Sequence, residues 1–267
     1  MRYFIFLFIL SISVVGSFAQ ADRSVQAKNN DKKSEKRQRI SSMIKQEEEG
    51  VLVYRKQSVF GLQLRTNGYG VFYELGRMRT PKAATIYGLE LTEIKDRKED
   101  KLGTNNFFAN SFVFGKMNNF YQAKLGFGQQ LVLGQKGNKN GVAVLALLQG
   151  GLSVGLLKPY YVDVLDAVGQ TRSIKYNSKD SALFLDRYSI TGGSGLFTGW
   201  SEVKIKPGLY AKTALRFDFG RYNESVQALE IGMSVDAYAD KIPLLVYNDP
   251  KRLFFQGHIA FVFGRRK

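Results

Sequence analysis

The 267-residue sequence contains no cysteine, one histidine and only five prolines. The absence of cysteine excludes disulfides, thiol catalysis and a lipid anchor attached through a cysteine. A single histidine cannot supply the clustered ligands of most transition-metal sites, so we expect no metal and no cofactor. The scarcity of proline favours long, uninterrupted strands.

No apolar run beyond residue 19 is long enough to form a transmembrane helix. The chain opens with a positive start, an apolar run that ends near Val15, and the small residues Ser17 and Ala19. This pattern is typical of a secretory signal peptide, which we expect to occupy residues 1–19 and to be cleaved on export.

The formal net charge of +16 favours anionic neighbours. For an exported protein these are lipid phosphates, acidic glycans or an acidic protein surface, and we expect no nucleic acid partner. Residues 20–50 are polar and of mixed charge, with too little apolar content to fold alone. They predict a flexible leader, and the helical spacing of Ile40, Met43 and Ile44 leaves a short docking helix as the alternative.

Apolar and polar residues alternate most clearly in two segments, 205–219 and 223–240. In the second segment, for example, the acidic Glu230 lies between Leu229 and Ile231. Successive side chains of a strand point to opposite faces, so each segment predicts a strand with one apolar and one polar face. Their short separation is hairpin spacing.

The same alternation predicts seven further strands, nine in all, and Asn67–Gly68 is a strong hairpin signal between the first two. A membrane barrel with both ends on one side needs an even number. An even number results if 51–54 or 182–190 forms an additional strand, or if two of the nine predicted strands are parts of a single strand. We therefore expect about eight to ten strands. Residues 159–200 read as a long irregular insert. The seven further strands are predicted at about 58–65, 71–76, 87–92, 107–116, 121–128, 142–158 and 253–264.

The polar faces distinguish a membrane barrel from a soluble, lipocalin-like barrel. They are rich in glycine and carry both charge signs in balance, as expected of side chains enclosed in a narrow interior. We therefore predict an all-β fold, a closed antiparallel transmembrane β-barrel over residues 51–267. The residues expected to form its lumen cluster, structural or channel-lining, are Arg65, Glu74, Glu90, Lys124, Lys212, Arg216, Glu230, Asp236 and His258.

The last predicted strand carries apolar residues, mostly aromatic, at alternate positions: Phe255, Ile259, Phe261 and Phe263. This strand resembles the terminal assembly signal of small outer-membrane β-barrel proteins of didermic bacteria, although the tail 264–267 departs from that pattern. The resemblance implies a location in the bacterial outer membrane and contact with its lipids. It is one of architecture, so it implies no active site.

Few residues suggest catalysis. His258 would be the base of a membrane hydrolase, but no positioned nucleophile accompanies it. Gly151–Gly155 matches G-x-S-x-G, but it lies inside a predicted strand, where that motif has no strand-to-helix turn. Glu230 and Asp236 are about 20 Å apart along one strand, too far for a catalytic pair, and we expect each to meet Lys212 or Arg216 on the adjacent strand.

These observations predict a non-enzymatic barrel that acts as an anchor or subunit of a cell-envelope assembly. An envelope protein partner would bind through residues 20–50 or 159–200. The alternatives are a narrow channel or transporter and, less favoured, a lipid-modifying enzyme that uses His258. The mixed-sign loop 95–101 is expected to be a solvated loop.

Overall fold

The computed structural model of the chain describes Arg37, Ser41 and residues 54–103, 110–137, 140–166, 169–221 and 224–267. The expected signal peptide, nearly all of the leader and residues 51–53 lie outside the described residues. Within the described part, no helix has the length and apolarity needed to cross a membrane.

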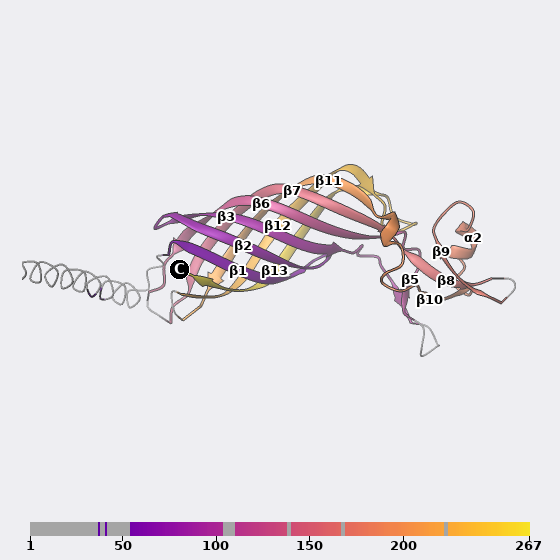
Figure 1. Cartoon of the computed structure of the whole chain (residues 1–267), viewed down its shortest axis with the longest axis horizontal. Coiled ribbons are helices and arrows are strands. Elements are labelled where there is room, and N and C mark those ends of the chain that lie inside the picture. Colours follow the sequence, from indigo (N-terminus) through magenta and orange to yellow (C-terminus); the bar gives the residue numbers. More distant parts are fainter. Residues whose placement is uncertain are drawn as a thin grey trace, which may run out of the picture.

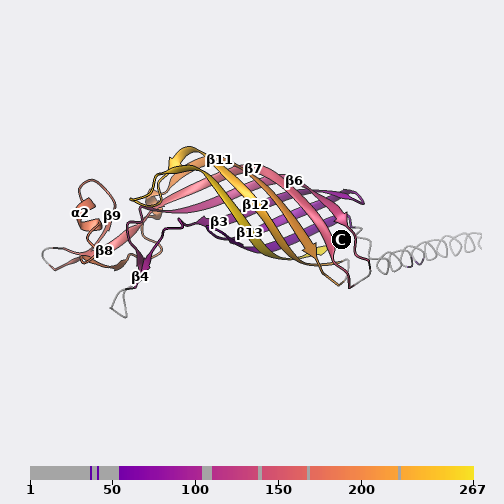
Figure 2. The ribbon, with the colours of Figure 1, turned by 180° about the vertical axis from the view of Figure 1, so that it is seen from behind.

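Eight antiparallel strands close into a ring in the order β1, β13, β12, β11, β7, β6, β3, β2 (Figures 1 and 2). The predicted closed antiparallel β-barrel is therefore confirmed, with the even strand number that a single-chain membrane barrel requires. Their bounds are β1 (Lys56–Arg65), β2 (Gly68–Thr80), β3 (Ala83–Ile94), β6 (Asn118–Gly134), β7 (Ala143–Pro159), β11 (Lys204–Asp218), β12 (Ser225–Ile242) and β13 (Lys251–Arg266).

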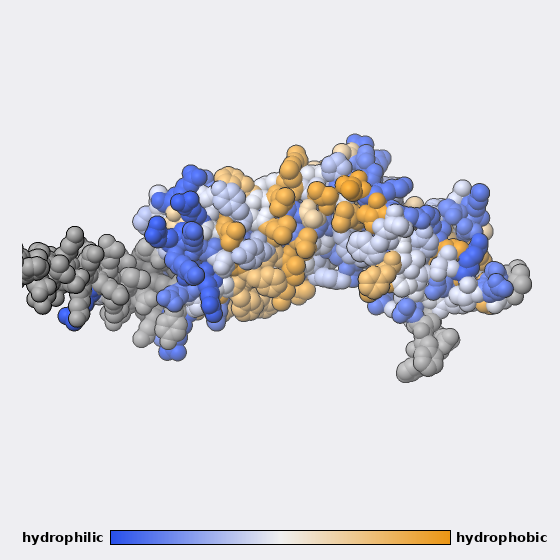
Figure 3. Space-filling view, in the orientation of Figure 1, coloured by the Kyte–Doolittle hydropathy of each residue, from blue (hydrophilic) through white to orange (hydrophobic). Residues whose placement is uncertain are grey.

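The outer face of the ring is apolar, whereas the charged side chains of its strands are mostly enclosed, the reverse of a soluble barrel. On β6 and β7 the paired leucines Leu125 and Leu152 are 64% and 62% exposed, whereas the neighbouring Lys124 and Ser153 are buried. Figure 3 shows apolar side chains over the middle of the ring and hydrophilic ones toward both of its ends. Each ring strand has 10 or more residues, enough to cross a hydrocarbon layer when tilted.

The predicted hairpin between β1 and β2 is confirmed, with Thr66 and Asn67 as its loop and Arg65 paired opposite Gly68. Gly68 has φ of +153°, and a Cβ there would lie 1.9 Å from the carbonyl oxygen of Glu93 on β3. Only glycine therefore fits this position, where three strand ends meet closely.

The predicted strand at 107–116 is not part of the ring. Its described residues contain only β5 (Phe112–Val113), which pairs with β4 (Lys101–Leu102) outside the barrel. The next ring strand, β6, begins at Asn118, directly after this segment. Phe112 belongs to a separate apolar core, which explains why an apolar segment here does not enter the ring.

The described residues of the insert at 159–200 form regular elements rather than irregular structure, and 182–190 is not a strand. The insert contains a three-stranded sheet of β10 (Ile190–Gly193), β8 (Tyr161–Leu165) and β9 (Thr171–Lys175), with α2 (Ser181–Phe184) and η1 (Trp200–Glu202). With 95–103 and 110–117 it forms what we call the loop-end unit, at the end of the barrel away from the C-terminus (Figure 1). The buried core of this unit is Phe112, Val162, Val164, Ile174, Phe184 and Ile190.

Candidate functional site

All nine residues predicted for the lumen are buried inside the ring, in two groups. The mid-lumen cluster consists of Glu74, Lys212, Arg216, Glu230 and His258. The loop-end cluster consists of Arg65, Glu90, Lys124 and Asp236. Alternation on seven of the eight strands brings them together, because every second side chain points inward.

In the mid-lumen cluster, Arg216 on β11 bridges two carboxylates. Its guanidinium donates to Glu230 Oε2 and Glu74 Oε2, each at 2.5 Å for Nη2. Lys212 Nζ lies 2.8 Å from Glu230 Oε1 and 3.9 Å from Glu74 Oε1. Because Arg216 and Glu230 are paired directly across β11 and β12, the register itself positions the strongest contacts.

In the loop-end cluster, Asp236 lies 2.6 Å from Lys124 Nζ and 3.5 Å from Arg65 Nη2. Glu90 lies 3.3 Å from Arg65 and 3.5 Å from Lys124. The expectation that Asp236 would meet Lys212 or Arg216 is therefore wrong, whereas the same expectation for Glu230 is confirmed. The cationic partners of Asp236 come from β1 and β6, neither of which is next to β12 in the ring.

Each cluster contains two cations and two carboxylates, if His258 is counted as neutral. A buried charge is costly unless it is paired, and removing one partner leaves the other uncompensated. Local neutrality therefore lets eight ionised side chains occupy a narrow interior.

The candidate catalytic residues, Ser153 and His258, instead make contacts inside the packed lumen. His258 Nε2 lies 3.1 Å from Glu230 Oε1, and the residue is only 4% exposed. Ser153, in the G-x-S-x-G sequence, lies within β7, and its Oγ is 2.7 Å from Tyr238 Oη. Neither is placed against a surface that a substrate could reach.

A third ionic group, near the C-terminal end of β13, was missed in the sequence. Arg266 donates to Asp218 and, at 2.9 Å, to Gln57 Oε1, and Lys136 Nζ lies 3.6 Å from Asp218. Asp218 belongs to the polar face of β11, so its alternation was a usable signal. The tail after Phe263 is a continuation of β13 whose last arginine points into the lumen.

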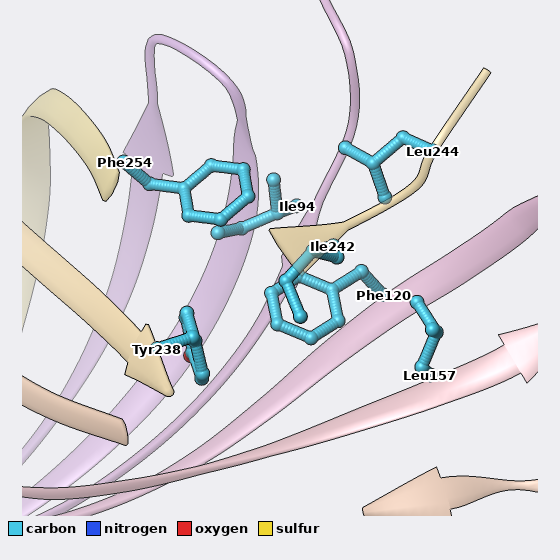
Figure 4. Packing of buried hydrophobic residues seen from close by; sticks show 7 residues of the cluster. All are labelled: Ile94, Phe120, Leu157, Tyr238, Ile242, Leu244 and Phe254. Atoms are coloured by element: carbon cyan, nitrogen blue, oxygen red, sulfur yellow. The ribbon is translucent and has the colours of Figure 1, made fainter. Parts of the chain in front are cut away.

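An apolar cluster closes the loop end of the lumen (Figure 4). The rings of Phe120, Tyr238 and Phe254 pack against one another with centroids 5.1 to 6.1 Å apart. Tyr238 Oη also accepts a hydrogen bond from Gln122, which ties the cluster to the charges beneath it. Its members are Ile94, Phe120, Leu157, Tyr238, Ile242, Leu244 and Phe254.

The other half of the lumen holds two more apolar clusters. One is centred on Ile86 and Leu145, and the other on Val59 and Phe72. Lys212 Nζ lies 4.5 Å from the Phe72 ring centroid, so this packing continues directly from the mid-lumen cluster. The described side chains thus fill the lumen along its length.

The loop-end unit is held by its own polar contacts. Tyr160 Oη accepts a hydrogen bond from Val113 N at 3.1 Å, and burial raises the pKa of this hydroxyl. The hydrogen bond from Lys175 lowers the pKa of Glu202, which keeps this exposed pair ionised. Among the described residues, no group of three or more histidine and carboxylate side chains is placed to hold a metal ion.

The predicted assembly-signal residues, Phe255, Ile259, Phe261 and Phe263, all point outward from β13 and are exposed. Their role in assembly stays a prediction. Of the aromatic residues near the insert, Tyr121 and Trp200 stack with ring centroids 5.7 Å apart on the outer wall.

Comparison with solved structures finds Neisserial surface protein A, at 10% sequence identity and a TM-score of 0.36, covering 79% of this chain and 96% of that one. It also finds Ail, the attachment invasion locus protein of Yersinia pestis, at 11% identity and a TM-score of 0.35, covering 80% and 100%. Ail in complex with the heparin analogue sucrose octasulfate matches equally. No protein-family model and no curated protein matches the sequence.

We predict that Glu230→Gln lowers the free energy of unfolding by about 3–5 kcal/mol, because it leaves Lys212 and Arg216 with one carboxylate between them. Equilibrium unfolding in urea, with the chain folded into lipid vesicles, measures this change. The double variant Lys212→Met/Glu230→Gln restores a 1:1 charge balance and should recover part of the loss. Glu202→Gln, in an exposed ion pair, is the matched control and should change little. A Glu230→Gln variant as stable as the wild type would contradict the account.

Proposed function

We propose that the chain is a non-enzymatic β-barrel of the bacterial outer membrane that acts as an anchor or subunit of a cell-envelope assembly. The observation that carries this proposal is the combination of a filled lumen with a separately packed unit at one end. A barrel of this kind holds a fixed position in a membrane and presents a surface beyond it.

The outer surface supports the membrane part of the proposal. Exposed leucines and aromatic residues on the ring would be unfavourable in water, whereas in hydrocarbon they match the solvent. A closed ring satisfies backbone groups without water, and even-stranded barrels of this type belong to outer membranes. The expected signal peptide and the resemblance of the last strand agree with export to that membrane.

The lengths of the connections between strands support one direction of the barrel in the membrane. At the end near the C-terminus the links between ring strands are 81–82, 135–142 and 219–224, whereas the other end has one short link, 66–67, and the longer links 95–117, 160–203 and 243–250. The other end carries the long connections that make the loop-end unit. Outer-membrane barrels have short periplasmic turns and longer extracellular loops, so the proposal directs the loop-end unit outward from the cell.

The loop-end unit offers a surface for a protein partner. Tyr188 and Phe197 are 97% and 89% exposed, and Leu196 is also highly exposed. Large apolar side chains this exposed are typical of interaction sites when they gather on one structural unit.

The channel alternative has less support. An eight-stranded barrel has an interior just wide enough for side chains. The described residues fill it with ion pairs and, above them, with the apolar cluster around Phe120 and Tyr238. The hydrolase alternative lacks an accessible base, because His258 is enclosed beside Glu230.

Isolation of the tagged full-length chain in a mild detergent tests the proposed role. We expect it to co-migrate with one envelope protein in constant proportion, and Tyr188→Ser/Phe197→Ser to abolish this association without altering barrel folding. Lys179→Ser, on the same unit, is the matched control. If the association is lost only when residues 24–48 are deleted, the partner binds the leader and not the loop-end unit. A chain that always migrates alone would contradict the proposed role.

Planar-bilayer recording tests the channel alternative. We expect the wild-type chain to give no discrete conductance steps, because charges and apolar clusters block the lumen in series. Lys212→Ala should also stay silent, since the apolar cluster above it is intact. Steady ion-selective current through the wild type would favour the channel.

A further inference from the structure

A large groove lies on the outer wall of the barrel, beneath the loop-end unit. Its volume is about 1180 Å³, and β1, β2, β3, β6 and β7 supply its wall. Lys158 and Trp200 mark its upper edge, where the 196–200 segment covers the strand ends.

The groove is graded from charged to apolar along the strands. Lys95, Asn119 and Lys158 form one row across β3, β6 and β7. Asn119 pairs with Lys158. Lys95 lies opposite Asn119, because the preceding residue Ile94 pairs with Phe120. One step toward the barrel centre, the outward row is Tyr69, Glu93, Tyr121 and Leu156. The next row is Val71, Leu91, Ala123 and Val154, which is entirely apolar.

Two lysines of this row have no carboxylate partner in the described part of the chain. Lys158 is only 3% exposed, and its ammonium donates to Leu196 O and lies 5.2 Å from the Trp200 ring. The ammonium of Lys95 lies 4.8 Å from the Tyr69 ring. A buried lysine held only by a carbonyl and an aromatic face is poorly compensated.

The acidic residues of the groove are already engaged. Glu99 pairs with Lys116 at 2.9 Å, and Asp96 accepts from Asn248 Nδ2 at 2.9 Å. Glu93 is hydrogen-bonded to the Tyr69 hydroxyl. Hydrogen bonds to neutral groups leave the charges of Glu93 and Asp96 in place. The four lysines that line the groove, Lys95, Lys101, Lys116 and Lys158, nevertheless outnumber its three carboxylates, Glu93, Asp96 and Glu99, so its net formal charge is +1.

We propose that this groove binds an anionic lipid of the leaflet at the loop end, with its phosphate headgroup between Lys95 and Lys158 and its acyl chain along the apolar rows. The inference rests on the proposed membrane placement. The spacing of the two lysines suits one phosphate group. Two strand separations put the Cα atoms of Lys95 and Lys158 about 10 Å apart, so their flexible side chains can both reach the same phosphate. Tyr121 and Trp200 lie at the level where aromatic residues meet headgroups.

Trp200 is the one tryptophan of the chain and lines the groove, so its fluorescence reports on this site alone. The full chain is placed in phosphatidylcholine nanodiscs that contain a small, fixed fraction of chain-brominated lipid. We expect brominated phosphatidylglycerol to quench Trp200 more strongly than brominated phosphatidylcholine. Lys95→Gln and Lys158→Gln should each reduce the preference roughly fivefold, and added salt should weaken it.

Lys251→Gln is the matched control, because Lys251 begins β13 at the same end of the barrel but outside the groove. It should leave the preference unchanged. Lys95→Gln keeps the test decisive if Lys158→Gln does not fold. Equal quenching by the two brominated lipids, or an equal loss in Lys251→Gln, would overturn the lipid site alone. No quenching by either lipid would instead overturn the membrane placement.

Discussion

The structure depends on closure of the strand ring between β1 and β13. In hydrocarbon no water is available to satisfy free backbone groups, so an open sheet edge is not tolerated. Here the pairing runs from Gln57–Arg266 to Arg65–His258. Beyond it, Lys56 and Lys267 exchange backbone hydrogen bonds at 2.8 Å, so the start of the first strand and the end of the last are tied together.

Closure also decides what the interior can hold. With eight strands, every inward side chain faces others at close range, and unpaired charges would be costly. The ion pairs around Arg216 and Asp236 meet this constraint in two neutral groups, and apolar clusters occupy the remaining space. Because the lumen is used for packing, the proposed binding surfaces are those of the outer wall and the loop-end unit.

The strand positions and the inward faces could be predicted because alternation is a local property. The alternation of side chains along each strand was enough to place Lys212, Arg216 and Glu230 in the lumen. The partners of Glu230 followed from the hairpin between β11 and β12. The partners of Asp236 did not follow, since Arg65 and Lys124 come from strands far away in the sequence. Which side chains meet across a lumen depends on strand tilt and stagger, and these appear only when the ring is closed.

The loop-end unit was missed for a different reason. Its strands have two to five residues, too few to establish alternation, and its core draws Phe112 and Ile174 from separate connections. The lysine row was equally hidden, because Lys95 and Lys158 become neighbours only through the register of β3, β6 and β7. Alternation within single strands was therefore enough to predict the barrel. The candidate binding surfaces depend on the pairing of segments that are distant in the sequence.

The central claim is that apolar side chains face lipid while ionised ones are enclosed. The chain has no cysteine, so single cysteines along β7 can each carry a nitroxide label in proteoliposomes. At Leu148, Leu152 and Val154 the account predicts strong relaxation by oxygen, which concentrates in lipid, and little by a water-soluble nickel complex. At Gln149 and Ser153 it predicts protection from both. Relaxation by the nickel complex that is greatest at the three apolar positions would contradict the account.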